Sequence, residues 1–421
     1  MTSNAPTDSP AARNPYAVLR NDDFVRYLAG RLVAALGQQM LTVAVGWELY
    51  DRTGSALALG LVGLTEMTAM VLLTLPAGHL ADNYNRKRII LTALLVATAS
   101  SLGLTLISAL HGPVLAIYAC LFTAAVARTF LWPASSAFLT SLVPRPQFPL
   151  AVTWNSGAFQ LSSVAGPALG GALIAIMGRH VAHPAAVVYA LNALASLSCF
   201  VLLWFIRKTH VVANPEKMTL ANLATGFRFV FAQRLILGMI TLDMFAVLLG
   251  GATALLPVYA KDILHAGPDG LGLLQAALPL GAVTSALFLA HRPPMERAGR
   301  SLLWAVTFFG VATIAFGLSR WFWFSFGMLV FCGMMDNISV VVRHTSVQLL
   351  TPDEKRGRVS AVNSLFIGTS NELGGFESGF VAYLVGPVFS VVAGGIGTIA
   401  VVLMVAWLWP EIRRYGRLAG P

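Results

Sequence analysis

The sequence predicts an all-α membrane protein with twelve transmembrane helices in two halves of six, on the strength of three observations. Hydrophobic residues make up 57% of the 421 residues and charged residues 11%, against about 25% charged residues in soluble domains. Mean hydropathy is +0.73. Apolar runs near 20 residues recur along the chain, which is the length that crosses a hydrocarbon layer about 30 Å thick. The two halves also share short motifs at equivalent places.

The predicted spans are apolar runs separated by short polar segments. They cover residues 27–49, 55–77, 89–110, 113–135, 154–177, 184–206, 236–259, 271–291, 301–319, 321–344, 360–384 and 388–409. The domain organisation that follows is an N-terminal tail 1–26, a first half 27–206, a linker 207–234, a second half 235–409 and a C-terminal tail 410–421.

The distribution of basic residues predicts the orientation. With the N-terminus in the cytoplasm, 21 of the 28 Lys and Arg residues fall on the cytoplasmic side, four on the other side and three inside spans. This is the positive-inside pattern, so both termini are expected in the cytoplasm of a multi-pass protein of the inner cell membrane. The same count explains the net charge of +10 without nucleic acid as a partner.

Span 360–384 is polar for a membrane helix, but the basic segments on either side of residues 359–412 both read as cytoplasmic. Two crossings must lie between them, and residues 388–409 supply only one. A polar span that crosses a membrane is expected to face the bundle interior or a water-filled cavity.

An internal repeat supports the division into halves. Pro144 and Asn155 recur as Pro352 and Asn363, each 208 residues later. Two six-helix repeats are the layout of many secondary transporters, whose substrate site lies near the bilayer midplane between the halves.

Charged side chains inside the predicted spans are the candidates for a proton or substrate site, because such residues are costly in a bilayer. They are Glu66, Asp243, Asp336, Glu372, Glu377, Arg31, Arg128 and Arg343. Two interpretations stay open: fixed pairs that align helices, or proton coupling by carboxylates whose proton affinity changes with their surroundings. Glu48 lies near the outer end of its span, where solvation at the membrane interface is expected.

Helical spacing orders these candidates. Arg31, Gln38 and Thr42 share a face that suits an anionic or polar substrate group. Glu377 shares a face with Asn363, whereas Glu372 lies about 140° from Glu377 at 100° per residue. We therefore favour Glu66, Asp243 and Glu377 as the titrating carboxylates.

The stretch GHLADNYNRKR, residues 78–88, resembles the signature between spans 2 and 3 of the major facilitator superfamily. The matching residues are Gly78, Leu80, Ala81, Asp82, Arg86 and Lys87, while Asn83 and Asn85 depart from the pattern. The resemblance implies a gating motif in which Asp82 meets the start of span 11 and latches the two halves on the cytoplasmic side. Arg86 is then expected to pair with acidic or carbonyl groups at neighbouring helix ends.

Span 5 carries GPALGG, with Gly166, Pro167, Gly170 and Gly171, similar to a helix-packing element associated with exporters of that superfamily. Together with residues 131–144 and 356–366, it resembles the transmembrane secretion effector branch, which includes enterobactin exporters and macrolide efflux proteins. The resemblance implies proton-coupled export by alternating access of a drug, macrolide or siderophore. Uptake of an organic anion and lysophospholipid translocation are the alternatives.

Other classes of function lack their motifs. The sequence has no GxxxxGK[ST] loop, so pumping driven by ATP on this chain alone is not expected. The three cysteines and eight histidines are scattered, so no metal site, cofactor or membrane-enzyme centre is predicted. The expected partners are a small-molecule substrate, protons and the lipid bilayer, with a monomer as a plausible state; a scaffold or sensor is the remaining rival.

Overall fold

The computed structural model describes residues 15–207, 227–293, 295–352 and 355–416, and most of these residues are helical. The first helix group contains α1 (Asp22–Thr53), α2 (Ala56–Asn83), α3 (Arg86–Ala109), α4 (Val114–Leu142), α5 (Phe148–Met177) and α6 (Pro184–Trp204). Two short 3₁₀ turns, η2 (Ala17–Arg20) and η3 (Arg145–Gln147), precede α1 and α5. The predicted tail 1–26 and linker 207–234 lie partly outside the described residues.

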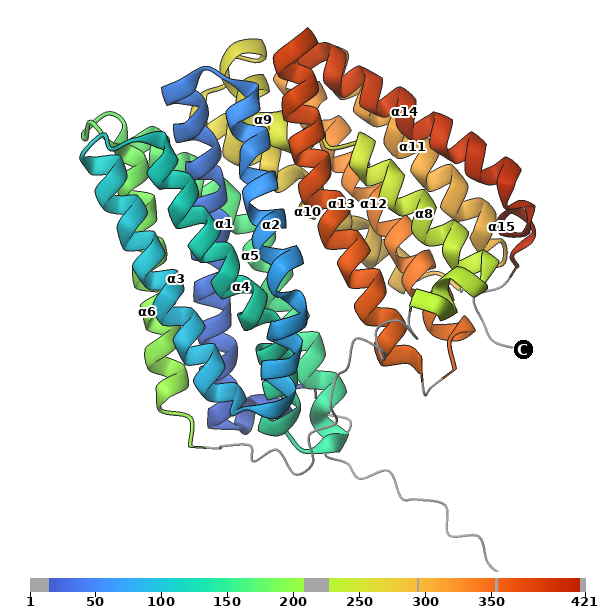
Figure 1. Cartoon of the computed structure of the whole chain (residues 1–421), viewed down its shortest axis with the longest axis horizontal. Coiled ribbons are helices and arrows are strands. Elements are labelled where there is room, and N and C mark those ends of the chain that lie inside the picture. Colours follow the sequence, from blue (N-terminus) through green and yellow to red (C-terminus); the bar gives the residue numbers. More distant parts are fainter. Residues whose placement is uncertain (1–14, 208–226, 294, 353–354, 417–421) are drawn as a thin grey trace, which may run out of the picture.

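The second helix group begins with α8 (Arg234–Leu249), which is followed by η4 (Ala252–Leu255), α9 (Leu256–Val258) and η5 (Tyr259–Ile263). It continues with α10 (Gly267–Ala290), α11 (Ala298–Leu318), α12 (Phe322–Leu350), α13 (Arg356–Val385), α14 (Pro387–Leu408) and α15 (Pro410–Arg414). The two groups lie side by side, converge at the end that holds α9 and diverge at the other (Figure 1). They meet chiefly where α2 packs on α13 and α5 packs on α10.

The diverging end carries the loops between α2 and α3, α4 and α5, α10 and α11, and α12 and α13, and we call it the basic end (Figure 1). It is where the sequence places most of the described Lys and Arg residues. The opposite end carries the loop between α1 and α2 and the segment from η4 to η5.

Helix α1 begins at Asp22, five residues before the predicted span, because the sequence caps it there. The Asn21 side chain accepts hydrogen bonds from the backbone N–H groups of Asp23 and Phe24. Asp22 and Asp23 occupy the first turn, where the helix dipole favours negative charge. The polar start of α1 therefore adds a turn that hydropathy alone does not detect.

The span predicted at 236–259 is present as an apolar segment from Arg234 to Ile263, but it is not one continuous helix. Helix α8 ends at Leu249, and the chain passes through the 3₁₀ turn η4 and α9 into the π-helical turn η5. Two successive glycines, Gly250 and Gly251, lie at the break, and glycine is a poor helix former. A Cβ at Gly251 would lie 2.8 Å from the Gly374 carbonyl carbon of α13, so the bent chain also needs glycine for close approach.

Eleven helices of the described chain are long and apolar enough to cross a membrane, so the protein is a multi-pass membrane protein. One of these segments runs from Arg234 to Ile263, through the break. Helix α13 is 30 residues long but is not among the eleven, in keeping with the polarity of its sequence.

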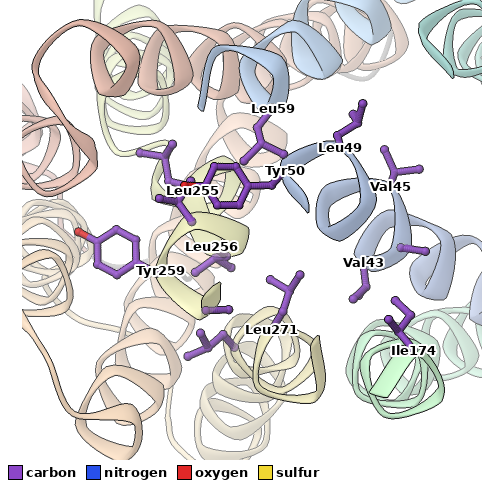
Figure 2. Packing of buried hydrophobic residues seen from close by; sticks show 14 of the residues in the cluster. Val43, Val45, Leu49, Tyr50, Leu59, Ile174, Leu255, Leu256, Tyr259 and Leu271 are labelled. Atoms are coloured by element: carbon purple, nitrogen blue, oxygen red, sulfur yellow. The ribbon is translucent and has the colours of Figure 1, made fainter. Parts of the chain in front are cut away.

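The buried apolar residues show which end is closed. One cluster draws on both helix groups at the opposite end: it contains Val45 and Leu49 of α1 together with Leu255, Leu256 and Tyr259 of the second group (Figure 2). The clusters toward the basic end each belong to one group. The burial of apolar surface therefore holds the two groups together at the opposite end.

The predicted C-terminal tail is in part a packed element. Ile412 of α15 is fully buried in an apolar cluster with α8 and α11. The backbone N–H of Ala298 donates a 3.0 Å hydrogen bond to the carbonyl of Gly416, which ties the chain end to the start of α11.

Candidate functional site

An ion pair joins two helices of the first group inside their spans. Nη2 of Arg128 on α4 lies 2.6 Å from Oε2 of Glu66 on α2. The side chains are 36% and 19% exposed, so the pair is partly accessible rather than sealed in the core. Glu66, predicted as a titrating carboxylate, thus has a cationic partner in this structure.

Glu372 of α13 brings a second carboxylate to this pair from the other helix group. Its charge interacts with those of both Glu66 and Arg128. The approach depends on close packing of α2 on α13: a Cβ at Gly63 would lie 2.5 Å from the backbone oxygen of Glu372. Glu372 therefore lies within electrostatic reach of the Glu66–Arg128 pair where the groups join, and we call Glu66, Arg128 and Glu372 the central charge cluster.

A second cluster lies wholly within the second helix group. Nη1 of Arg343 on α12 lies 2.5 Å from Oδ2 of Asp243 on α8, and the side chains are 2% and 7% exposed. The charge of Asp336, two turns earlier on α12, interacts with both. We call these residues the α8–α12 cluster. Because both helices belong to one group, this pair fits the fixed-pair interpretation.

The contacts of the described residues place none of the remaining candidates in the central charge cluster or in the α8–α12 cluster. The Glu377 carboxylate accepts a 3.5 Å hydrogen bond from the hydroxyl of its neighbour Ser378. Nε of Arg31 is buried and has no hydrogen-bond partner among the described residues. Gln39, next to Gln38 but outside the predicted polar face of α1, donates to Ser163 of α5 at 3.1 Å.

Glu48 is buried, whereas the sequence predicted that it would be solvated at the membrane interface. It is only 8% exposed and forms a 3.1 Å ion pair with Arg52, one turn later on α1. Arg52 also donates to the backbone carbonyl of Gly112. The i, i+4 spacing of Glu48 and Arg52 was the signal in the sequence.

The gating motif forms local bonds at the basic end. Arg86 donates to the backbone carbonyls of Ala81 at 3.2 Å and Ala137 at 3.3 Å. Lys87 donates to the carbonyls of Trp204 and Ile206 at 2.9 and 2.5 Å. These cations lie where the carbonyls of α2, α4 and α6 collect, and cations stabilise such helix ends.

The two residues that depart from the motif, Asn83 and Asn85, also form local hydrogen bonds. Asn83 donates to the His79 carbonyl at 2.9 Å, and the Asn85 side chain caps α3 by accepting from the N–H of Arg88 at 3.3 Å. Gly78 and Leu80 lie in the last turns of α2. The Asp82 side chain lies outside the described part of the chain, so its predicted latch remains a prediction.

The glycines of the span-5 element line two different interfaces. Added Cβ atoms at Gly166 and Gly170 would lie 2.5 Å from Gln39 Cβ and 2.9 Å from Met40 Cα of α1. A Cβ at Gly171 would lie 2.8 Å from Gly272 Cα of α10, and one at Gly272 would meet the carbonyl of Pro167. The element therefore packs α5 against α1 and also against the other helix group.

Replacing Gly171 with valine is expected to destabilise the protein by about 1–3 kcal/mol, the usual cost of overpacking a tight contact. Thermal unfolding in detergent measures the change. Gly157→Val is the matched control on the same helix, because a Cβ at Gly157 meets no heavy atom within 4 Å. Equal losses for both variants would mean that valine in α5, not the contact with α10, is the cause.

Within the described residues, no group of three or more His, Cys, Asp or Glu side chains is placed to hold a metal ion.

Comparison with known proteins identifies the family. The profile of the transmembrane secretion effector family matches residues 13–413. The chain is 28% identical over 390 residues to the enterobactin exporter EntS of Citrobacter koseri, covering 91% of each chain. It is also 28% identical over 392 residues to that exporter of Shigella flexneri, again with 91% of each covered. These relatives are transporters, not enzymes.

Solved structures of transporter homologues have the same fold as this chain. A bacterial homologue of the human lysosomal transporter Spinster, inward-facing and occupied, has a TM-score of 0.74 at 14% identity, covering 95% of this chain and 99% of that one. A bacterial homologue of the iron transporter ferroportin, in an inward-facing state, has a TM-score of 0.74 at 16% identity, covering 94% and 99%. The chain therefore belongs to the transmembrane secretion effector family of the major facilitator superfamily and is a membrane transporter.

Proposed function

We propose that this transporter exports a small, partly apolar organic molecule from the cell in exchange for protons. The observation that carries the proposal is the central charge cluster, in which Glu372 of one helix group lies within electrostatic reach of the Glu66–Arg128 ion pair of the other. A charge cluster divided between two moving bodies changes its electrostatics whenever the bodies move.

The coupling follows from the placement of Glu372. When the helix groups rock apart along the contact between α2 and α13, Glu372 moves away from both Glu66 and Arg128. The proton affinity of a carboxylate in a low-dielectric site changes when its charged neighbours and its access to water change. Glu372 would therefore bind a proton in one state and release it in the other, so that each cycle carries a proton across. Asp82, Arg86 and Lys87 would close the basic end in the alternate state.

The topology that we propose has twelve spans, with the basic end and both termini in the cytoplasm. Helix α13 is the twelfth span, because its 30 residues are about 45 Å long at 1.5 Å per residue. The excess of Lys and Arg at the basic end supports this orientation in the inner membrane.

The substrate that we favour is of the siderophore type, because the enterobactin exporters match over 91% of the chain. A macrolide or another drug is the second candidate. Both are small organic molecules with apolar and polar parts, as expected for a site built between polar and apolar helix faces.

Inverted membrane vesicles test the direction and the coupling together. Enterobactin, erythromycin and a fluorescent lysophospholipid serve as probes, and an imposed pH gradient, acidic inside, drives export into the vesicle lumen. We expect accumulation of enterobactin, its loss when a protonophore collapses the gradient, and proton efflux that depends on the probe.

Other outcomes decide against the proposal. Accumulation only in right-side-out vesicles would indicate an importer, and transfer of the lysophospholipid alone would indicate a lipid translocator. Accumulation of enterobactin that persists with the protonophore would exclude proton coupling but leave export standing.

A further inference from the structure

Two adjacent residues of α1 bond to two adjacent residues of η5 across the helix groups. The Tyr50 hydroxyl donates to the Asp262 carboxylate, and Nζ of Lys261 lies 2.5 Å from Oδ1 of Asp51. Lys261 Nζ also lies 5.9 Å from the centre of the Tyr50 ring. We call these four residues the α1–η5 contact. It joins the groups at the opposite end, beyond the central charge cluster.

The α1–η5 contact caps the apolar cluster that both groups share. Tyr50 is 7% exposed and lies beside Leu255 and Leu256, the residues that lead into η5 (Figure 2). Burial of the apolar cluster stabilises the contact between the helix groups. The two polar bonds fix which side chains face one another. An opening at this end must break both.

The bent chain after α8 places the η5 residues. A regular helix would have continued through Gly250, whereas the break and the π turn redirect residues 259–263. Single π turns are rare and often lie at functional sites. Because successive helical residues differ by about 100° in direction, Tyr50 and Asp51 reach η5 from two sides of α1. The two bonds together therefore oppose rotation of α1 as well as separation.

The neighbouring cation does not compete for Asp51. Arg52 is held by Glu48 and by the Gly112 carbonyl, both within the first helix group. The side chains of Asp51 and Lys261 are 55% and 35% exposed, so water screens their ion pair. Exposed pairs are weak enough to break and reform in each transport cycle.

We infer that the α1–η5 contact is the outer latch of the transporter, closed while the basic end is open and broken when substrate leaves on the other side. The inference rests on the proposed export function for its direction. The closure itself is a property of the two helix groups and can be measured without any substrate.

Distance measurements between spin labels on the two groups test the latch. The labels occupy Thr53→Cys and His265→Cys, both exposed at the opposite end, in a protein whose three native cysteines are replaced by alanine. Lys261→Asp places a second carboxylate against Asp51, and the ratio of long to short distances is expected to rise about three- to tenfold. The double variant Asp51→Lys/Lys261→Asp restores the pair with reversed sign and is expected to return the short distance.

Arg179→Asp is the control, because it reverses an exposed charge at the same end on the loop between α5 and α6. It should leave the distances unchanged. Identical distance distributions in the single and double variants would overturn the latch. Distances that respond as expected while no probe is transported in vesicles would reject the export proposal and leave the latch intact.

Discussion

Replacing Glu372 with glutamine is expected to lower proton-driven accumulation of substrate about 100-fold, the usual loss when a positioned proton-transfer group is removed. Glutamine keeps the size and polarity of the side chain but cannot gain and lose a proton. The carboxylate that α13 brings near the Glu66–Arg128 pair is thereby replaced by a fixed neutral group. Counterflow, in which labelled substrate exchanges for unlabelled substrate without net proton movement, should continue.

The contrast between the two assays is what makes the result informative. A purely structural role for Glu372 would lower accumulation and counterflow together. Glu377→Gln is the matched control, because it makes the same chemical change five residues later on α13, where the contact is with Ser378. If Glu377→Gln abolished coupling and Glu372→Gln did not, the central charge cluster would not be the proton site.

Arg343→Met is expected to destabilise the protein by about 3–5 kcal/mol, because it leaves the buried Asp243 carboxylate without its cation. Arg343 is 2% exposed and Asp243 7%, so water cannot replace the lost partner. Unfolding of the purified protein in mixed micelles with increasing SDS measures the change. The double variant Asp243→Asn/Arg343→Met should recover most of the loss, since an ion pair replaced as a whole costs little.

A second ion pair of the same helix group supplies the comparison. Arg234 and Glu411 are 3.7 Å apart with side chains 71% and 45% exposed, so Arg234→Met should cost less than about 1 kcal/mol. Similar losses for Arg234→Met and Arg343→Met would show that burial of the Asp243–Arg343 pair is not what matters. A double variant as unstable as Arg343→Met would point to lost packing of the arginine.

The sequence was sufficient for the arrangement of the helices along the chain. Apolar runs gave the spans to within a few residues at most ends, because hydropathy is a local property. Helices α2, α4 and α12 run six or seven residues past the predicted ends, to Asn83, Leu142 and Leu350. Two other departures follow from local signals: Asn21 starts α1 earlier, and the glycines at 250 and 251 bend the seventh span. Both signals were present in the sequence, and capping and glycine rules identify them.

The candidate site was harder to predict, because its members lie far apart in the chain. Helical spacing places Glu372 and Glu377 on different faces of α13 but does not say which of the two lies near the first helix group. That choice depends on which face of α13 packs on α2, and Gly60, Gly63 and Gly379 set it by allowing the backbones to approach. The partners of Tyr50 and Asp51 likewise emerge only once η5 bends toward α1.

The sequence by itself determined the membrane class and the family, and it predicted the division into halves and the charged residues that need partners inside the membrane. Each follows from local hydropathy, charge counts or motifs. Only the tertiary structure decided which charges meet: Arg128 with Glu66, Arg343 with Asp243, and Lys261 with Asp51. The physical reason is that an ion pair depends on the distance between side chains in space, which helix packing fixes and separation along the chain does not.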